Sequence, residues 1–158
     1  MKKLLIAGIL SCMLSLGLMA GSPEFVFSVG GNADYLKTIN DKDSFTGTSV
    51  GVGIYNRENN VAMGMDFETS FMSDYQTYTT EINFKYYFDK NLAGIVGVNY
   101  TYYDFDNYNK NVYGLGMHTK FEYTIVKGFG IYGKYSFENM DSGFKSANKL
   151  STGIFYKF

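Results

Sequence analysis

The 158-residue sequence has one cysteine, one proline and no tryptophan, and its 15 acidic residues nearly balance its 14 basic ones. A single cysteine excludes a disulfide-stabilised scaffold, and the lack of excess positive charge disfavours a nucleic-acid-binding protein. After residue 20 there is no long hydrophobic run, and the mean hydropathy of −0.14 argues against several membrane-spanning helices. Glycine, tyrosine and phenylalanine are abundant instead, with 18, 15 and 14 residues.

The first 20 residues are typical of a secretory signal peptide. Two lysines follow Met1, residues 4–20 are almost wholly apolar, and the small Ala20 precedes a cleavage position. A buried or membrane-anchoring helix and a lipoprotein signal at Cys12 are the alternatives. Removing 20 of 158 residues leaves a mature chain of 138 residues, 21–158, which we expect to form one domain. The loss of two lysines changes its net charge from −1 to −3.

The mature chain is dominated by an alternation of apolar and polar residues with a period of two, which predicts β-strands. Eight segments follow this pattern: residues 25–35, 46–56, 61–71, 77–88, 92–103, 112–125, 128–138 and 147–158. Three connections are expected to be long and polar: 36–45, 103–111 and 139–147. The remaining connections are expected to be short turns.

The two faces of these predicted strands differ in chemistry. One face carries nearly twenty phenylalanine and tyrosine rings. Most of these rings lie near the two ends of the strands and form two aromatic girdles, with aliphatic residues such as Ile82 and Val98 between them. The other face carries glycine, small polar and charged residues. Because side chains fill the interior of an eight-stranded barrel, the ring-rich face must point outward. The sequence therefore predicts an all-β fold, an eight-stranded antiparallel up-and-down transmembrane β-barrel, rather than a soluble calyx.

Strand parity directs charged residues of both signs into the barrel. The expected inward charges are Asp34, Asp66, Glu68, Glu81, Glu122 and Glu138, with Arg57, Lys85, Lys120, Lys134, Lys149 and Lys157. Because an unpaired buried charge is costly, we expect acids and bases on facing walls to pair. The hypothesis is a lumen charge network that plugs the barrel, formed by Asp66, Glu68, Glu81, Lys85, Lys120, Glu122 and Lys134. A narrow ion pathway is the alternative.

Other candidate sites are weaker. His118, the single histidine, is predicted to face inward as a general base or as a hydrogen-bonded interior residue. No Ser–His–acid arrangement and no metal-ligand spacing is evident, so we predict no catalytic residue, metal or cofactor. Glycines such as Gly51 and Gly53 are interpreted as small inward residues that make room for their neighbours.

The chain ends in Gly153-Ile154-Phe155-Tyr156-Lys157-Phe158. With the signal peptide and two aromatic girdles, this ending resembles the small eight-stranded bacterial outer-membrane β-barrels, the opacity-protein and outer-membrane-protein-A-like group, over residues 24–158. The resemblance implies a Gram-negative-type outer membrane, periplasmic chain ends and surface-exposed loops. It also implies that the barrel-assembly machinery reads a C-terminal signal at Ile154, Tyr156 and Phe158.

We therefore expect a non-enzymatic outer-membrane protein with a plugged lumen and a structural or adhesion-like surface role. Its expected partners are outer-membrane lipids, the assembly machinery and periplasmic chaperones, and host or environmental ligands that bind loops 36–45, 103–111 and 139–147; no nucleic acid is expected. The alternatives are a narrow channel for small solutes or hydrophobic compounds and, less favoured, a lipid-modifying barrel enzyme.

Overall fold

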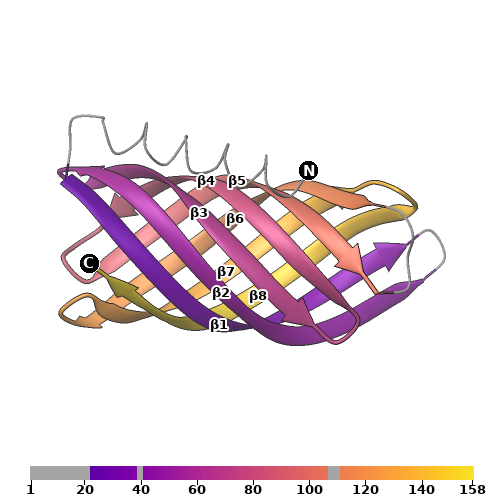
Figure 1. Cartoon of the computed structure of the whole chain (residues 1–158). Helices are drawn as coiled ribbons and strands as arrows, with labels where there is room; N and C mark the ends of the chain where they lie inside the picture. The colour runs from indigo at the N-terminus through magenta and orange to yellow at the C-terminus, as the bar shows by residue number, and fades with distance from the viewer. Residues whose placement is uncertain (1–21, 39–40, 107–110) are drawn as a thin grey trace.

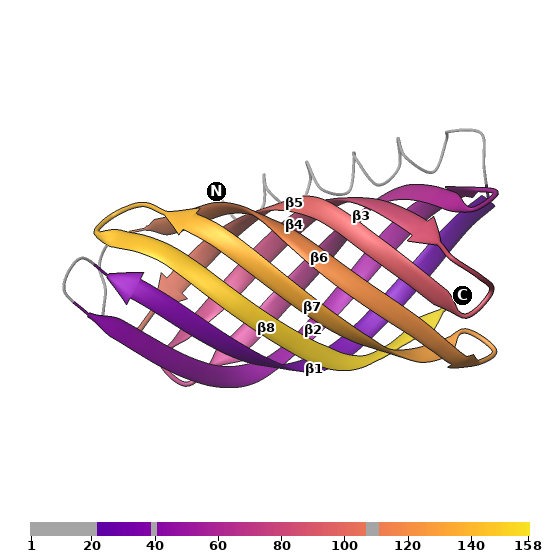
Figure 2. The same ribbon diagram turned by 180° about the vertical axis from the view of Figure 1, so that it is seen from behind.

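The computed structural model describes residues 22–38, 41–106 and 111–158; the predicted signal peptide lies outside them. Eight strands wind obliquely around one barrel (Figures 1 and 2). Their bounds are β1 Ser22–Thr38, β2 Lys42–Glu58, β3 Val61–Met72, β4 Tyr75–Tyr87, β5 Leu92–Phe105, β6 Val112–Val126, β7 Phe129–Met140 and β8 Phe144–Lys157. Every strand is antiparallel to the next, and β8 pairs with β1 to close the sheet. The predicted fold class is confirmed.

The two ends of the barrel have different connections (Figure 1). The end that holds the C-terminus, called the terminal end below, also holds the turns β2–β3, β4–β5 and β6–β7. Asn59, Lys127 and Gly128 adopt positive φ angles of 55°, 34° and 84° in two of these turns, as tight two-residue hairpins favour. The connections β1–β2, β3–β4, β5–β6 and β7–β8 lie at the opposite end, the loop end.

The prediction overstated the long connections at 36–45, 103–111 and 139–147. In the structure β1 and β2 each have 17 residues and stay paired as far as Lys37 and Lys42, while β8 begins at Phe144. A strand needs only about 9–11 residues to cross a bilayer. Beyond that length the outer face meets water instead of lipid, so pairing continues without the apolar alternation on which the prediction relied.

The outer surface is an apolar belt. Ile82, Val96, Leu115 and Met117 are each more than half exposed, in the middle of their strands. Exposed aromatic rings lie toward both ends of the strands. Those at the terminal end are Phe25, Phe27, Phe84, Tyr86, Phe88, Phe121, Tyr123, Phe129, Tyr156 and Phe158. Those toward the loop end are Tyr35, Phe71, Tyr100, Tyr135 and Phe137. An apolar surface of this extent fits lipid and not water. Across residues 22–38, 41–106 and 111–158, no helix is both long and apolar enough to span a bilayer.

The interior also contains several aromatic rings, although the ring-rich face points outward as predicted. At the terminal end a cluster, the terminal cluster, consists of Val26, Tyr55, Ala62, Tyr87, Ala93, Ile95, Tyr132 and Phe155. At the opposite end the loop cluster consists of Leu36, Tyr75, Tyr103, Val112 and Ala147, with partly buried apolar residues packed against it. These two clusters fill the lumen toward both ends, where their rings pack beside the charged groups.

Candidate functional site

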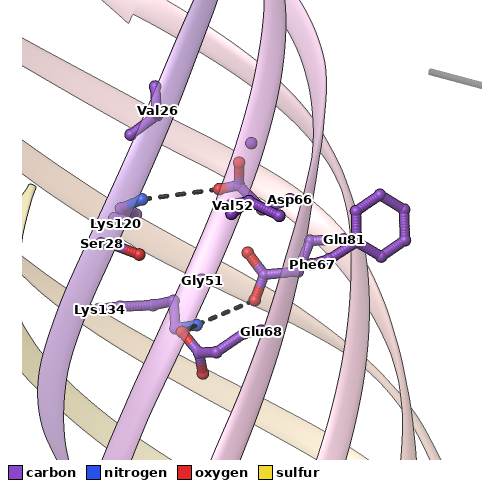
Figure 3. A pocket seen from close by; sticks show the side chains of 11 residues that line it. Val26, Ser28, Gly51, Val52, Asp66, Phe67, Glu68, Glu81, Lys120 and Lys134 are labelled. Carbon is purple, nitrogen blue, oxygen red and sulfur yellow. Dashed lines mark hydrogen bonds and ion pairs between the residues drawn. The ribbon is translucent and has the colours of Figure 1, made fainter. Parts of the chain in front are cut away.

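The lumen charge network occupies the interior of the barrel. Its seven predicted members lie on four strands, Asp66 and Glu68 on β3, Glu81 and Lys85 on β4, Lys120 and Glu122 on β6, and Lys134 on β7. All seven point inward because they alternate with lipid-facing neighbours. Figure 3 shows five of them converging from both walls.

Lys134 joins two walls of the barrel at the centre of this network. Its Nζ lies 2.7 Å from Glu68 Oε2 and 3.0 Å from Glu81 Oε1, so that β7 is connected to β3 and β4 across the lumen (Figure 3). In the strand register Glu81 faces Asp66 and not Glu68. Glu68 and Glu81 are therefore diagonal neighbours, close enough to share one ammonium group.

Lys120 forms the second cross-lumen connection. Its Nζ lies 3.1 Å from Glu122 Oε1 and 3.6 Å from Asp66 Oδ2. The same Asp66 oxygen accepts hydrogen bonds from the Tyr55 hydroxyl at 2.7 Å and from Asn83 Nδ2 at 3.1 Å. The carboxylate of Asp66 is thus held by one cation and two neutral donors.

A third group lies toward the terminal end. Glu122 is fully buried, and its Oε2 lies 2.8 Å from Lys85 Nζ and 3.2 Å from Lys157 Nζ. Lys85 also pairs with Glu24 at 2.8 Å, a residue that the sequence analysis missed because the predicted strand began at residue 25. Glu24 shares the inward parity of Ser28, so an earlier strand start would have revealed it.

Tyrosine hydroxyls satisfy carboxylates toward the loop end. The Tyr103 hydroxyl donates to Glu138 Oε2 at 2.7 Å, and Lys149 Nζ lies 3.2 Å from Glu138 Oε1. Asp34 accepts a hydrogen bond from the Tyr75 hydroxyl at 2.9 Å. A buried carboxylate can therefore be stabilised here by a neutral donor where the sequence analysis expected only lysines.

Arg57 has the predicted inward parity, opposite the buried Ala62, but it lies at the mouth of the lumen. It is exposed at the terminal end, with its guanidinium 3.8 Å above the ring of Tyr87 and its Nε donating to the Asn59 carbonyl. It precedes the β2–β3 turn, where the strand leaves the lumen and water is available. The described lumen groups are then Glu24, Asp34, Asp66, Glu68, Glu81, Glu122 and Glu138, with Lys85, Lys120, Lys134, Lys149 and Lys157.

Side chains fill the space around these charges. A cavity beside Asp66, Glu68 and Lys134 has a volume of about 10 Å³, which is room for about one water molecule. Gly64 and Gly114 leave space for rings: a Cβ atom at either position would press on Tyr55 or Tyr103. The interior is therefore a packed polar core.

His118 lies in this core, opposite Ser136 in the register and with Nε2 3.5 Å from Glu81. A histidine, a serine and an acid thus meet on the wall, although their sequence spacing did not suggest it. All three are buried, and neither ring nitrogen of His118 has a hydrogen-bond partner within the described residues. The trio is therefore enclosed by the packed interior of the barrel. In the same residues no group of three or more His, Cys, Asp or Glu is arranged to hold a metal.

The chain matches no protein family model and no curated protein. Solved structures do resemble it. The attachment invasion locus protein Ail of Yersinia pestis, in complex with the heparin analogue sucrose octasulfate, aligns with 87% of this chain and 99% of its own, at 14% identity and a TM-score of 0.65. Neisserial surface protein A aligns with 85% and 97%, at 18% identity and a TM-score of 0.57.

The N-terminal β-barrel domain of Pseudomonas aeruginosa OprF also resembles the chain. The alignment covers 87% of this chain and 98% of that domain, at 12% identity and a TM-score of 0.56. At such identities the likeness concerns the fold. It agrees with the apolar exterior, the closed sheet of eight strands and the filled polar interior. The chain therefore has the fold of the small eight-stranded outer-membrane β-barrels.

Proposed function

We propose that the mature chain is a non-enzymatic outer-membrane protein with a closed lumen, which presents its loop end at the cell surface. The observation that carries the proposal is the filled interior, in which the central cavity holds about one water molecule. Aromatic clusters lie on both sides of the charge network. A hydrated ion would have to displace buried rings or separate ion pairs, so the barrel serves as a membrane scaffold and not as a pore.

Planar-bilayer recording tests the closed lumen. The reconstituted mature chain is expected to give no steady conductance steps, and neither is Lys127→Ala, a matched variant at the exposed β6–β7 turn. The proposal would be contradicted if the unaltered protein gave regular conductance steps that Glu81→Ala abolished and Lys127→Ala did not. That result would support the narrow channel. Migration on a gel with and without heating confirms that each preparation is folded.

The surface role is supported by the likeness to Ail and to a neisserial surface protein over 97–99% of their chains. The predicted loop segments 36–45, 103–111 and 139–147, together with residues 73–76 at the β3–β4 connection, contain six aspartates and four lysines. This balance suits neutral or cationic partners better than sulfated glycans. We expect the reconstituted barrel not to bind immobilised heparin at physiological salt; retention there would refute this choice of partner.

A lipid-modifying enzyme is the weaker candidate because His118 and Ser136 are buried inside the barrel. Expression in a Gram-negative host should leave the lipid A mass spectrum unchanged. A modified lipid A that disappears with His118→Ala would establish the enzyme instead.

Export to the outer membrane completes the proposal. Cleavage after residue 20 would release the mature barrel 21–158, and the assembly machinery would read Ile154, Tyr156 and Phe158. These three side chains face outward and are exposed, and the Phe158 backbone N–H donates to the Phe25 carbonyl beside the closing seam. The mass of the protein in an outer-membrane fraction tests the cleavage. Phe158→Ala tests the signal: it should slow assembly in cells but leave refolding in detergent intact.

A further inference from the structure

An open hollow lies at the loop end of β8, β1 and β2, and most of the residues that line it have the outward parity of Tyr35. Its volume is about 510 Å³, and its lining includes Tyr35, Lys37, Lys42, Ser44, Ser146 and Asn148. In the register Lys37 faces Lys42 on β2 and Ser146 on β8. The hollow therefore presents two ammonium groups from neighbouring strands together with hydroxyl and amide groups. Its size lies within the usual range of ligand sites.

The two lysines differ from those of the lumen. Each of the five lumen lysines lies within 3.6 Å of at least one carboxylate. Neither Lys37 nor Lys42 forms an ion pair within residues 22–38, 41–106 and 111–158. Asp43 also lines the hollow, which leaves an excess of one positive charge. Like charges placed opposite one another on paired strands repel, so an anion between them would relieve that repulsion.

The position of the hollow relative to the apolar belt indicates where this anion comes from. Tyr35 lines the hollow and belongs to the outward ring of aromatics, with about half its surface exposed. Further from the loop end, Ala33 and Gly31 on β1 pair with Leu150 and Thr152 on β8. On the other side of β8, Thr152 pairs with Gly133 on β7. A Cβ added to Gly133 would touch nothing within 4 Å. Beyond Tyr35 and Leu150, small residues therefore make up the lipid-facing wall of these strands.

We propose that this hollow binds a phosphate-bearing membrane lipid of the leaflet at the loop end. The phosphate lies between Lys37 and Lys42, the rest of the headgroup contacts Ser44 and Asn148, and an acyl chain lies over Gly31 and Thr152. A lipid is favoured over a soluble phosphate because the exposed rings and aliphatic side chains of the apolar belt, such as Tyr35 and Leu150, lie next to the hollow on the same strands. The site is independent of the closed lumen, since none of its residues belongs to the charge network.

The test uses the mature chain in phosphatidylcholine nanodiscs doped with phosphatidic acid, with retained lipid counted by native mass spectrometry. The variant Lys37→Gln/Lys42→Gln removes both charges, and Lys90→Gln/Lys127→Gln removes two at the terminal end as a matched control. At roughly fivefold per lysine, the first variant should lower the retention of phosphatidic acid by about 30-fold, while the control changes it little. Equal losses in both variants, or no loss in either, would overturn the site.

A second pair of measurements separates the lipid from a soluble anion. Gly31→Leu adds bulk to this wall of small residues without touching a lysine, and it should weaken the retention of phosphatidic acid while the fold is kept. Glycerol 3-phosphate, which has the same phosphate but no acyl chain, should compete poorly. Full displacement by glycerol 3-phosphate together with an unaffected Gly31→Leu variant would assign the hollow to a soluble phosphate and refute the lipid.

Discussion

Replacement of Lys134 by methionine is the most informative perturbation of the lumen. Methionine keeps most of the volume of the side chain but removes the ammonium that lies 2.7 Å from Glu68 and 3.0 Å from Glu81. Glu81 is then left with His118 at 3.5 Å, and Glu68 loses the one lysine with which it forms an ion pair among the described residues. Two carboxylates would remain in the core without a full countercharge.

The expected cost follows from their burial. Removing one partner of a buried ion pair costs about 3–5 kcal/mol. Glu81 is almost completely buried, whereas the Glu68 side chain keeps 13% of its surface exposed, and the adjacent cavity accepts about one water molecule. We therefore expect the lower part of that range, about 3 kcal/mol, which is roughly a 150-fold change in the unfolding equilibrium constant.

Urea titration of the barrel in lipid vesicles measures this change, with circular dichroism as the signal because the chain has no tryptophan. Lys127→Met at the exposed β6–β7 turn is the matched control, with an expected effect within about 0.5 kcal/mol. Glu81→Gln completes a double-mutant cycle with Lys134→Met, and their coupling should reach about 0.5–3 kcal/mol. A Lys134→Met protein as stable as its control would show that the network does not hold the barrel together.

Two further predictions concern packing and a turn. Gly64→Ala should destabilise the barrel by about 1–3 kcal/mol because its Cβ presses on the Tyr55 ring, whereas Gly133→Ala on the open outer face should be nearly neutral in the same urea titration. In the β4–β5 turn, hydrogen bonds from the backbone N–H groups of Asn91 and Leu92 hold the pKa of Asp89 below its ordinary value of 3.8. Their stabilising effect is present above the unfolded pKa and is lost as the pH falls through the lower folded pKa. The amide NMR shift of Asn91 should therefore titrate with a midpoint below 3.8 and should stop titrating in Asp89→Asn; a midpoint at or above 3.8 would refute the capping role.

The number and order of the strands could be predicted from the succession of alternating segments along the chain. The direction of the two faces could be predicted from the parity of the residues. Along β4, for example, Ile82 and Phe84 face lipid while Glu81, Asn83 and Lys85 face the lumen. A slip of one residue would place every charge of the strand in the bilayer. For the charge network, the sequence could predict which strands lie side by side but not which residues lie opposite each other. The register that places Asp66 opposite Glu81 depends on the geometry of the turn between the strands.

The ends of the strands and the interior rings could not be predicted by the same reasoning. Outside the bilayer the alternation is no longer required, so β1 continues to Thr38 through polar residues. Tyrosine was counted as a lipid-facing residue because of its ring. A tyrosine with the parity of the lumen, such as Tyr55 beside Ile54 or Tyr103 beside Tyr102, instead brings both a ring and a hydroxyl into the barrel.

These inward tyrosines explain how a lumen with more carboxylates than lysines is stabilised. Four of them donate their hydroxyl to an acid, Tyr55 to Asp66, Tyr75 to Asp34, Tyr87 to Glu24 and Tyr103 to Glu138. A phenol supplies a strong donor to a charged acceptor without adding a charge that would itself need a partner. Its ring needs space on a neighbouring strand, which glycine provides. The inward tyrosines and the glycines beside them, such as Gly64 next to Tyr55 and Gly114 next to Tyr103, therefore meet a single requirement of a narrow barrel with an acidic interior.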